Sequence, residues 1–199
     1  MPNYKINYRD GDAYTRLSKR AGYRSRASLK LKEILKKDIS IKKGMSIIDL
    51  GSFPGGWTQV AKESVGNKGT VAAVDIQDMK EIKGTFFIHK SITELEDNDF
   101  EEFREKVPFD LVLSDMAPNI SGIRETDDAQ MIYLVENVLL VIDKFLKQGG
   151  STLIKVFQGD SLDYTRNALR CRFKACKVIK PLASRPHSKE TYLIGKEFK

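Results

Sequence analysis

The sequence predicts an α/β protein whose central sheet is mostly parallel and carries helices on both faces. Five short apolar runs between residues 46 and 157 are rich in Val, Ile or Phe, which is typical of parallel strands covered on both sides. Segments with helical spacing lie between most of these runs, so the chain alternates strand and helix in right-handed βαβ units. The length of 199 residues, of which 41% are hydrophobic, suits one domain with a substantial core.

The amino-terminal region precedes the predicted sheet. Residues 1–24 lack strong periodicity and are predicted to form a basic arm that is flexible or becomes ordered on a substrate. Residues 27–37 have helical spacing, and residues 25–199 are predicted to make up the folded part of a single domain that spans residues 1–199.

Strands and helices then follow in turn. The first strand breaks at Asp49 into a glycine-rich loop, and a helix follows directly. The long helix before the fifth strand has apolar residues spaced near 3.6 and is predicted to stop before Gly149 and Gly150. After the fifth strand come one helix and two more strands, which are joined by a polar link and are predicted to form an antiparallel edge. The predicted strands are Ser46–Leu50, Thr70–Ile76, Thr85–His89, Phe109–Asp115, Ser151–Phe157, Phe173–Lys180 and Thr191–Phe198, and the predicted helices are Ala27–Lys37, Trp57–Val65, Phe100–Lys106, Asp127–Leu146 and Asp160–Arg172.

Basic residues are concentrated at the two ends of the chain. Residues 1–43 contain thirteen Lys or Arg and four acids, residues 166–199 contain ten and two, and the middle contains eleven and twenty-one. We expect the two ends to come together on one face and to form a positive surface that neutralises phosphates. A single lysine is usually only solvated, but the asymmetry among these segments favours a nucleic-acid partner.

Composition argues against several other classes of protein. No run approaches the roughly eighteen apolar residues of a membrane span, and the first residues lack the apolar stretch of a signal peptide. A cytoplasmic protein without a membrane partner is therefore predicted. The two cysteines, Cys171 and Cys176, have no second cysteine pair and lack the ligand spacing of a zinc site, so we predict reduced thiols and no metal. No exposed apolar stripe is evident, which favours a monomer.

The loop after the first strand is the most informative local feature. The run SIIDLGSFPGGW, residues 46–57, places Gly51, Gly55 and Gly56 where strand becomes helix, as expected for close backbone approach or positive φ angles. Asp75 ends the next strand, where α/β nucleotide sites place an acid on ribose hydroxyls. The spacing matches neither the dinucleotide fingerprint nor the P-loop. A nucleoside ligand without phosphates is therefore predicted, and a nicotinamide oxidoreductase is disfavoured.

Charged side chains gather at the predicted carboxyl ends of the strands, where open parallel sheets bind ligands. Asp49, Asp75 and Asp115 end the first, second and fourth strands, and Lys155 lies within the fifth. An aspartate at a strand end often only caps the following turn or helix, and this interpretation stays open for Asp49 and Asp115. An ammonium group inside a buried parallel strand is costly unless it is paired or functional, so Lys155 is predicted to be functional.

Several segments of the chain resemble those of one known family. The segments YRSRASLKLKEI, DLGSFPGGW, SDMAPNISG, KVFQG and SRPHSKETYLIG are similar, in order and spacing, to those of the FtsJ/RrmJ (RlmE) family. Members of this family methylate a uridine ribose of large-subunit ribosomal RNA at its 2′-oxygen. The resemblance covers nearly the whole chain. It implies a Rossmann-like methyltransferase fold, S-adenosylmethionine as the cofactor, and ribosomal RNA in the large subunit as the partner.

The resemblance also implies a catalytic site, the family's Lys-Asp-Lys-Glu tetrad, which falls on Lys30, Asp115, Lys155 and Glu190. Methyl transfer to a ribose hydroxyl is an in-line displacement in which the hydroxyl must be aligned and must lose its proton. Lys155 is then expected to be the general base and Asp115 to position it, while Lys30 and Glu190 align the ribose. The tetrad identifies the reaction type and leaves the target RNA open.

The cofactor is expected to lie against the glycine loop and the strand ends. Ser91 stands where relatives often have an aspartate that holds the adenine amino group, and a serine can still accept one hydrogen bond. A lone tryptophan after a glycine loop is more often packed in the core, but the resemblance shifts Trp57 toward the cofactor pocket. The residues expected to contact the cofactor are Asp49, Gly51, Pro54, Gly55, Gly56, Trp57, Asp75, Ile76, Ser91 and Asp115.

Guanidinium and aromatic groups near both ends are expected to contact RNA, since guanidinium pairs with phosphate and aromatic rings stack on unpaired bases. Two other functions stay open. Transfer-RNA and cap-forming ribose methyltransferases share the tetrad, and a non-catalytic RNA-binding protein would use the same scaffold. The residues expected to contact RNA are Tyr23, Arg24, Arg26 and Arg185.

Overall fold

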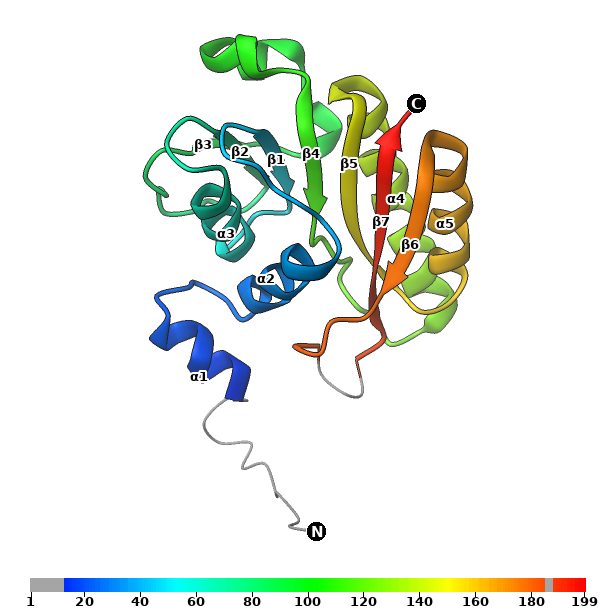
Figure 1. Cartoon of the computed structure of the whole chain (residues 1–199). Helices are drawn as coiled ribbons and strands as arrows, with labels where there is room; N and C mark the ends of the chain where they lie inside the picture. Colours follow the sequence, from blue (N-terminus) through cyan, green and yellow to red (C-terminus); the bar gives the residue numbers. More distant parts are fainter. Residues whose placement is uncertain (1–12, 185–187) are drawn as a thin grey trace.

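The computed structural model of the chain, which describes residues 13–184 and 188–199, is built around one seven-stranded sheet (Figure 1). The strands are β1 (Ser46–Leu50), β2 (Thr70–Asp75), β3 (Phe86–His89), β4 (Phe109–Ser114), β5 (Leu146–Phe157), β6 (Phe173–Ile179) and β7 (Glu190–Phe198). Their order in the sheet is β3-β2-β1-β4-β5-β7-β6. Strands β1 to β5 pair in parallel, whereas β7 is antiparallel to both of its neighbours. The predicted α/β class, with an antiparallel strand near the carboxyl terminus, is confirmed.

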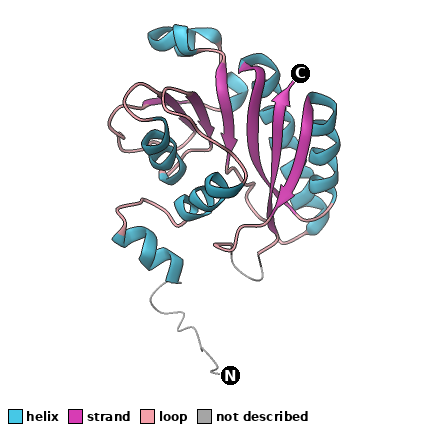
Figure 2. Cartoon of the chain, in the orientation of Figure 1, coloured by secondary structure: helices cyan, strands magenta, loops and turns pink. Residues whose placement is uncertain are grey.

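Helices cover both faces of the sheet (Figure 2). They are α1 (Ala13–Arg20), α2 (Ala27–Lys37), α3 (Gly56–Val65), α4 (Arg124–Phe145) and α5 (Asp160–Arg172), with the 3-10 helices η2 (Ile92–Glu94) and η3 (Asp97–Lys106). One core cluster joins α2 and α3 to the face that includes Ile47, and the other joins α4 and α5 to the face that includes Ile48. Because neighbouring strand residues point to opposite faces, both isoleucines are buried and the strand is apolar throughout. None of the helices in the described part of the chain is long and apolar enough to cross a membrane.

Three elements differ from the prediction. The amino-terminal arm contains the helix α1, in which Ser18 is the buried residue, so the arm offered little apolar periodicity to detect. Residues 1–12 of the arm lie outside the described residues. The long helix ends at Phe145, and Gly149, at φ 78°, lies in β5 where the register with β4 shifts. The helix predicted over residues 100–106 belongs to η3, which is kinked at Phe103.

The chain order brings the carboxyl ends of β1, β4 and β5 to one edge of the sheet. β1 pairs with β2 on one side and with β4 on the other, which creates the switch in strand order where open α/β sheets bind ligands. Helix α2 and the segment between β6 and β7 both lie at this edge (Figure 1). They contact each other, since Glu33 in α2 accepts a hydrogen bond from the Leu182 N–H at 3.1 Å, and just beyond α2 Asp38 pairs with Lys177 of β6 at 2.5 Å. The two basic ends of the chain therefore come together, as predicted.

Candidate active site

Two lysine–carboxylate pairs lie together at the carboxyl edge of the sheet. Lys155 Nζ, on β5, lies 3.2 Å from Asp115 Oδ1 and also donates to the Asp115 backbone carbonyl. Lys30 Nζ, on α2, lies 2.7 Å from Glu190 Oε2 at the start of β7. Both lysines are buried. The four residues of the expected tetrad, which are far apart in the sequence, are thus brought together by four different segments.

Tyr192 links the two pairs, and the sequence analysis missed it. Its hydroxyl donates a hydrogen bond to Asp115 Oδ1 at 3.0 Å, and Lys30 Nζ lies 5.8 Å from the centroid of its ring. Tyr192 is also directly opposite Lys155 in the β5–β7 register. A signal was present in the sequence: Tyr192 follows Glu190 by two positions in a strand, so both side chains point to the same face.

The charges of the site shift the pKa of two groups. Burial alone would raise the pKa of the Glu190 carboxyl, but the hydrogen bond and charge of Lys30, with the charge of Lys155, hold it below its ordinary value. The pKa of Tyr192 lies well above its ordinary value, because burial and the negative charges of Asp115 and Glu190 disfavour a phenolate. At neutral pH, Glu190 is therefore a carboxylate and Tyr192 a neutral hydrogen-bond donor.

Three carboxyl groups lie at the ends of the neighbouring strands β1, β2 and β4. Asp49 is fully buried and accepts a hydrogen bond from Thr58 Oγ1 at 2.6 Å, while its Oδ1 has no hydrogen-bond partner among the described residues. Burial raises the pKa of Asp49 to about 7, against the lowering effect of the Thr58 hydrogen bond and with the charges of Asp115 and Asp75 adding to the rise. Asp49 is therefore about half ionised at neutral pH, and a cationic ligand bound beside these three carboxyl groups would favour its charged form.

Asp75 and its neighbour suit the nucleoside part of such a ligand. Asp75 Oδ2 accepts from the Phe53 N–H and Oδ1 from the Gln77 N–H, both at 2.8 Å. Because each carboxylate oxygen has two lone pairs, both oxygens can also accept from a ribose hydroxyl. Ile76, directly after β2, is 71% exposed and offers apolar surface to a flat ring. Together with the acids, these residues fit S-adenosylmethionine, which carries a sulfonium, an ammonium, a ribose and an adenine.

The glycines of the loop after β1 are required by the packing of the chain itself. Gly51 and Gly55 have φ values of 74° and 107°, so the predicted positive φ angles are confirmed. A Cβ atom at Gly51 would lie 2.2 Å from Met116 Cγ, and one at Gly56 would lie 2.2 Å from Ser25 Oγ. The close approach that the sequence predicted is therefore made to neighbouring side chains of the protein.

Two other residues expected to contact the cofactor have structural contacts of their own. Trp57 is buried, its Nε1 donates to the Ala27 carbonyl at 2.9 Å, and its ring centroid lies 5.8 Å from that of Tyr192. This arrangement supports the alternative interpretation, that Trp57 packs in the core beneath the tetrad. Ser91 caps η2, where its Oγ accepts from the Thr93 N–H at 3.3 Å, and its contact with adenine stays a prediction.

The residues expected to contact RNA are mainly engaged in holding the fold. Tyr23 is buried, and its hydroxyl donates to Glu63 Oε2 at 2.6 Å, so its ring is not presented for stacking on a base. Arg24 donates to the Pro54 carbonyl at 3.3 Å and to two carbonyls beyond β2, which ties the start of α2 to the glycine loop. Arg26 donates to the Ala183 carbonyl at 2.8 Å.

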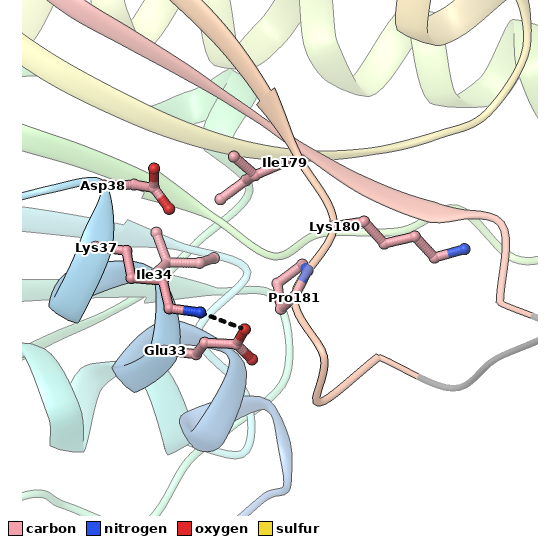
Figure 3. A pocket seen from close by; sticks show the side chains of 7 residues that line it. All are labelled: Glu33, Ile34, Lys37, Asp38, Ile179, Lys180 and Pro181. Carbon is pink, nitrogen blue, oxygen red and sulfur yellow. Dashed lines mark ion pairs between the residues drawn. The ribbon is translucent and has the colours of Figure 1, made fainter.

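Arg185 lies outside the described residues, but the segment before it is anchored beside a hollow of about 200 Å³ (Figure 3). Glu33 pairs with Lys37 at 3.7 Å there and accepts from the backbone N–H groups of Leu182 and Ala183 at 3.1 and 3.2 Å. The lining has side chains of both charges and includes no member of the tetrad. We therefore interpret this hollow as part of the packing between α2 and the segment after β6. It is lined by Glu33, Ile34, Lys37, Asp38, Ile179, Lys180 and Pro181.

Comparison with known proteins matches the chain to the FtsJ-like methyltransferase family model over residues 23–198. Ribosomal RNA large subunit methyltransferase E of Pseudomonas aeruginosa is 42% identical over 191 residues, which is 94% of this chain and 91% of that protein. The protein of the same name from Xanthomonas oryzae pv. oryzae is 45% identical over 186 residues, 92% of this chain and 88% of that protein.

Solved structures show the same likeness. A Plasmodium falciparum protein described as a ribosomal RNA methyltransferase superposes with a TM-score of 0.80 at 28% identity and covers 88% of this chain and 98% of its own. An S-adenosylmethionine-dependent O-methyltransferase of Thermotoga maritima has a TM-score of 0.59 at 16% identity, covers 87% of this chain and 65% of its own, and shares the fold alone. The expected Rossmann-like methyltransferase fold is confirmed.

Proposed function

The chain belongs to the FtsJ-like methyltransferase family, and from this premise we propose that it methylates a ribose 2′-oxygen in large-subunit ribosomal RNA with S-adenosylmethionine. The observation that carries the proposal is the pair of buried lysine–carboxylate contacts joined through Tyr192. The names of the relatives support ribosomal RNA as the substrate. We also propose that the target is a uridine in the assembled subunit and that the protein acts as a cytoplasmic monomer.

The strand ends would hold the cofactor, and the tetrad would hold the ribose. Asp75 would accept the cofactor's ribose hydroxyls, Ile76 would contact its ring, and Asp49 and Asp115 would face its cationic groups. When bound, the cofactor supplies an electrophilic methyl group on a sulfonium. The residues of the chain then need to align the substrate hydroxyl with that methyl group and to remove its proton.

The contacts of Lys155 support its role as the group that takes this proton. In its neutral form Nζ would accept the 2′-hydroxyl proton, and the side chain and the backbone carbonyl of Asp115 would then stabilise the ammonium that forms. Tyr192 holds the Asp115 carboxylate in place through its hydroxyl. The hydrogen bond that Lys30 donates to Glu190 supports a role in which Lys30 would donate to a ribose oxygen and align the attacking hydroxyl.

Two other functions share parts of this site. A ribose methyltransferase acting on transfer RNA or on a messenger-RNA cap would use the same tetrad, and the names of the relatives favour ribosomal RNA over both. A protein that only binds RNA would not need two buried lysines, each of which loses its hydration and must be paired to be tolerated. Catalysis is therefore favoured over binding alone.

The test is transfer of labelled methyl from S-adenosylmethionine to large ribosomal subunits and, in parallel, to transfer RNA, followed by nuclease digestion to locate the label. Ribose label in the subunit is the expected result. Lys155→Ala should lower kcat by about 10² to 10⁴ and leave cofactor affinity within about two-fold of the wild type. Lys174→Ala, which removes an exposed lysine paired with Glu197, is the matched control and should change neither.

Each outcome decides one part of the proposal. Label only in transfer RNA would keep the mechanism and reject ribosomal RNA as the substrate. Label on a base would reject ribose methylation. Near-normal turnover by Lys155→Ala would reject Lys155 as the general base.

A further inference from the structure

The loop that follows Asp115 carries two apolar side chains that are largely uncovered by the described part of the chain. Ile120 is 68% exposed and Ile123 is 59% exposed. The loop leaves the end of β4 and passes below the arrowhead of that strand in Figure 1 on its way to α4. A single exposed isoleucine is common, but two of them within four residues of one another, beside a tetrad residue, form a local apolar surface. We call Ile120 and Ile123 the isoleucine rim.

An ordered loop presents the isoleucine rim. Asp127, in the first turn of α4, accepts from the N–H and the hydroxyl of Ser121 at 2.7 and 2.8 Å and from the Gly122 N–H at 3.3 Å. The Ser121 hydroxyl oxygen also accepts from the Ile123 N–H at 3.1 Å. These bonds fix the backbone between the two isoleucines, so a partner that packs against them loses little affinity to ordering of the loop.

The loop that carries the isoleucine rim joins the tetrad residue Asp115 to α4, and the start of α4 lies near the segment that precedes the tetrad residue Glu190. Lys189 directly precedes Glu190, and its carbonyl accepts from the Gln158 N–H at 2.9 Å. The residue after Gln158 is Gly159, and a Cβ atom there would lie 2.7 Å from Asp128 Oδ2, so the segment paired with Lys189 packs against the start of α4. Arg124, at the start of α4, is 66% exposed and lies 3.7 Å from Asp128 Oδ2. Lys189 and Arg124 are therefore two cations at the ends of the segments that adjoin the rim.

We propose that the isoleucine rim packs against the face of an unpaired nucleobase beside the target ribose. The inference rests on the proposed function, because it names part of the RNA that the same site would hold. A ribose whose 2′-oxygen reaches the buried tetrad cannot stay in a regular stacked helix, so a nearby base leaves the stack and exposes its flat, apolar face. Isoleucine is one of the side chains that proteins pack against unstacked bases, and Arg124 and Lys189 suit the adjoining phosphates.

Serine replacements test the contact without changing the charge. The double variant Ile120→Ser/Ile123→Ser should raise KM for large subunits roughly ten-fold, the factor that burial of one such side chain adds to a binding constant. Its kcat and its affinity for S-adenosylmethionine should stay within about two-fold of the wild type. The matched control is Leu140→Ser, because Leu140 is 65% exposed on the same helix that follows the loop. It lies about 24 Å along α4 from Arg124 and should change nothing.

An aromatic replacement distinguishes a nucleobase from another occupant. Ile123→Phe should keep KM at or below the wild-type value, because a ring stacks on a base. Binding of a fluorescein-labelled single-stranded oligoribonucleotide, measured with the same variants, decides the matter without catalysis. The serine variant should bind it roughly ten-fold more weakly, and the slope of log affinity against log salt, which reports phosphate contacts, should not change.

The outcomes separate the two proposals. Unchanged KM and unchanged oligoribonucleotide binding in the serine variant would overturn the role of the isoleucine rim while an active wild type keeps the proposed function. A phenylalanine variant as impaired as the serine variant would also overturn it, because a tightly fitted protein surface, and not a base, would then be the occupant. A wild type that binds the oligoribonucleotide through the rim but methylates no RNA would reject the proposed function alone.

Discussion

Asp49 offers a direct test of the electrostatics of the site. Its carboxyl group is fully buried at the end of β1, accepts one hydrogen bond from Thr58 at 2.6 Å, and has a second oxygen without a partner in the described structure. Burial raises its pKa from 3.8 to about 7. We predict that Asp49→Asn changes how the stability of the protein depends on pH.

The sign and size follow from proton linkage. Between about pH 4 and pH 7, native Asp49 holds a proton that the unfolded chain has released, so its contribution to the free energy of unfolding falls as pH rises and is lost above about pH 7. A pKa change from 3.8 to about 7 corresponds to about 4 kcal/mol over the full range, as an upper limit. Between about pH 5 and pH 8.5, about 3 kcal/mol of this is expressed. The asparagine amide is neutral throughout and removes the contribution.

Urea unfolding of both proteins at these two pH values measures the effect. The stability of the wild type minus that of Asp49→Asn should fall by about 3 kcal/mol from the lower to the higher pH, and taking the difference cancels the other titrating groups. Asp97→Asn, which removes a mostly exposed carboxylate on η3, is the control and should show no such trend. A difference that is constant, or that grows toward high pH, would refute the reasoning from burial.

Three further variants test single contacts, and a fourth, at Gly22, is a control. Tyr192→Phe removes the hydroxyl that donates to Asp115, so the rate constant of methyl transfer in single-turnover assays should fall about ten-fold while cofactor affinity stays unchanged. A rate constant within about two-fold of the wild type would contradict this role of the hydroxyl. Gly51→Ala combines a positive φ with a contact of 2.2 Å to a methionine side chain and should cost about 2–4 kcal/mol in urea unfolding. Gly22→Ala has a similar φ in open space and should cost only about 1 kcal/mol, so equal losses would contradict the steric argument. Glu33→Gln leaves one acceptor oxygen for two backbone N–H groups and should lower stability by about 1 kcal/mol, and unaltered unfolding would reject its anchoring role.

Most of the fold was predictable because its strands are buried on both faces. Runs such as residues 46–50 are almost continuously apolar, and most of them are followed by turn residues and then by helical spacing. What periodicity could not give was α1, whose eight residues bury a serine, and the start of β5, where a glycine at positive φ lies in a register shift and not at a helix end. The strand order also depends on packing that no local pattern encodes.

The site was predictable to the extent that its residues carry charge. Lys155 stood out as an ammonium inside an apolar strand, and the structure pairs it as that reasoning requires. Tyr192 did not stand out, because tyrosine is ordinary in a strand and its hydrogen bond to Asp115 spans 77 positions of sequence. The charge of Arg24 suggested a contact with RNA, but in the structure its guanidinium donates to backbone carbonyls of the protein.

The charges at the strand ends bear on the choice of ligand, for which the sequence offered only the spacing of the glycines. Asp49, Asp75 and Asp115 lie close enough for the charges of the last two to raise the pKa of the first. A cationic ligand such as a sulfonium nucleoside with an ammonium group would favour the ionised form of Asp49 and be attracted by the three carboxyl groups. Burial of these acids disfavours their charged forms in the free protein, and binding of a cationic cofactor would offset this unfavourable free energy.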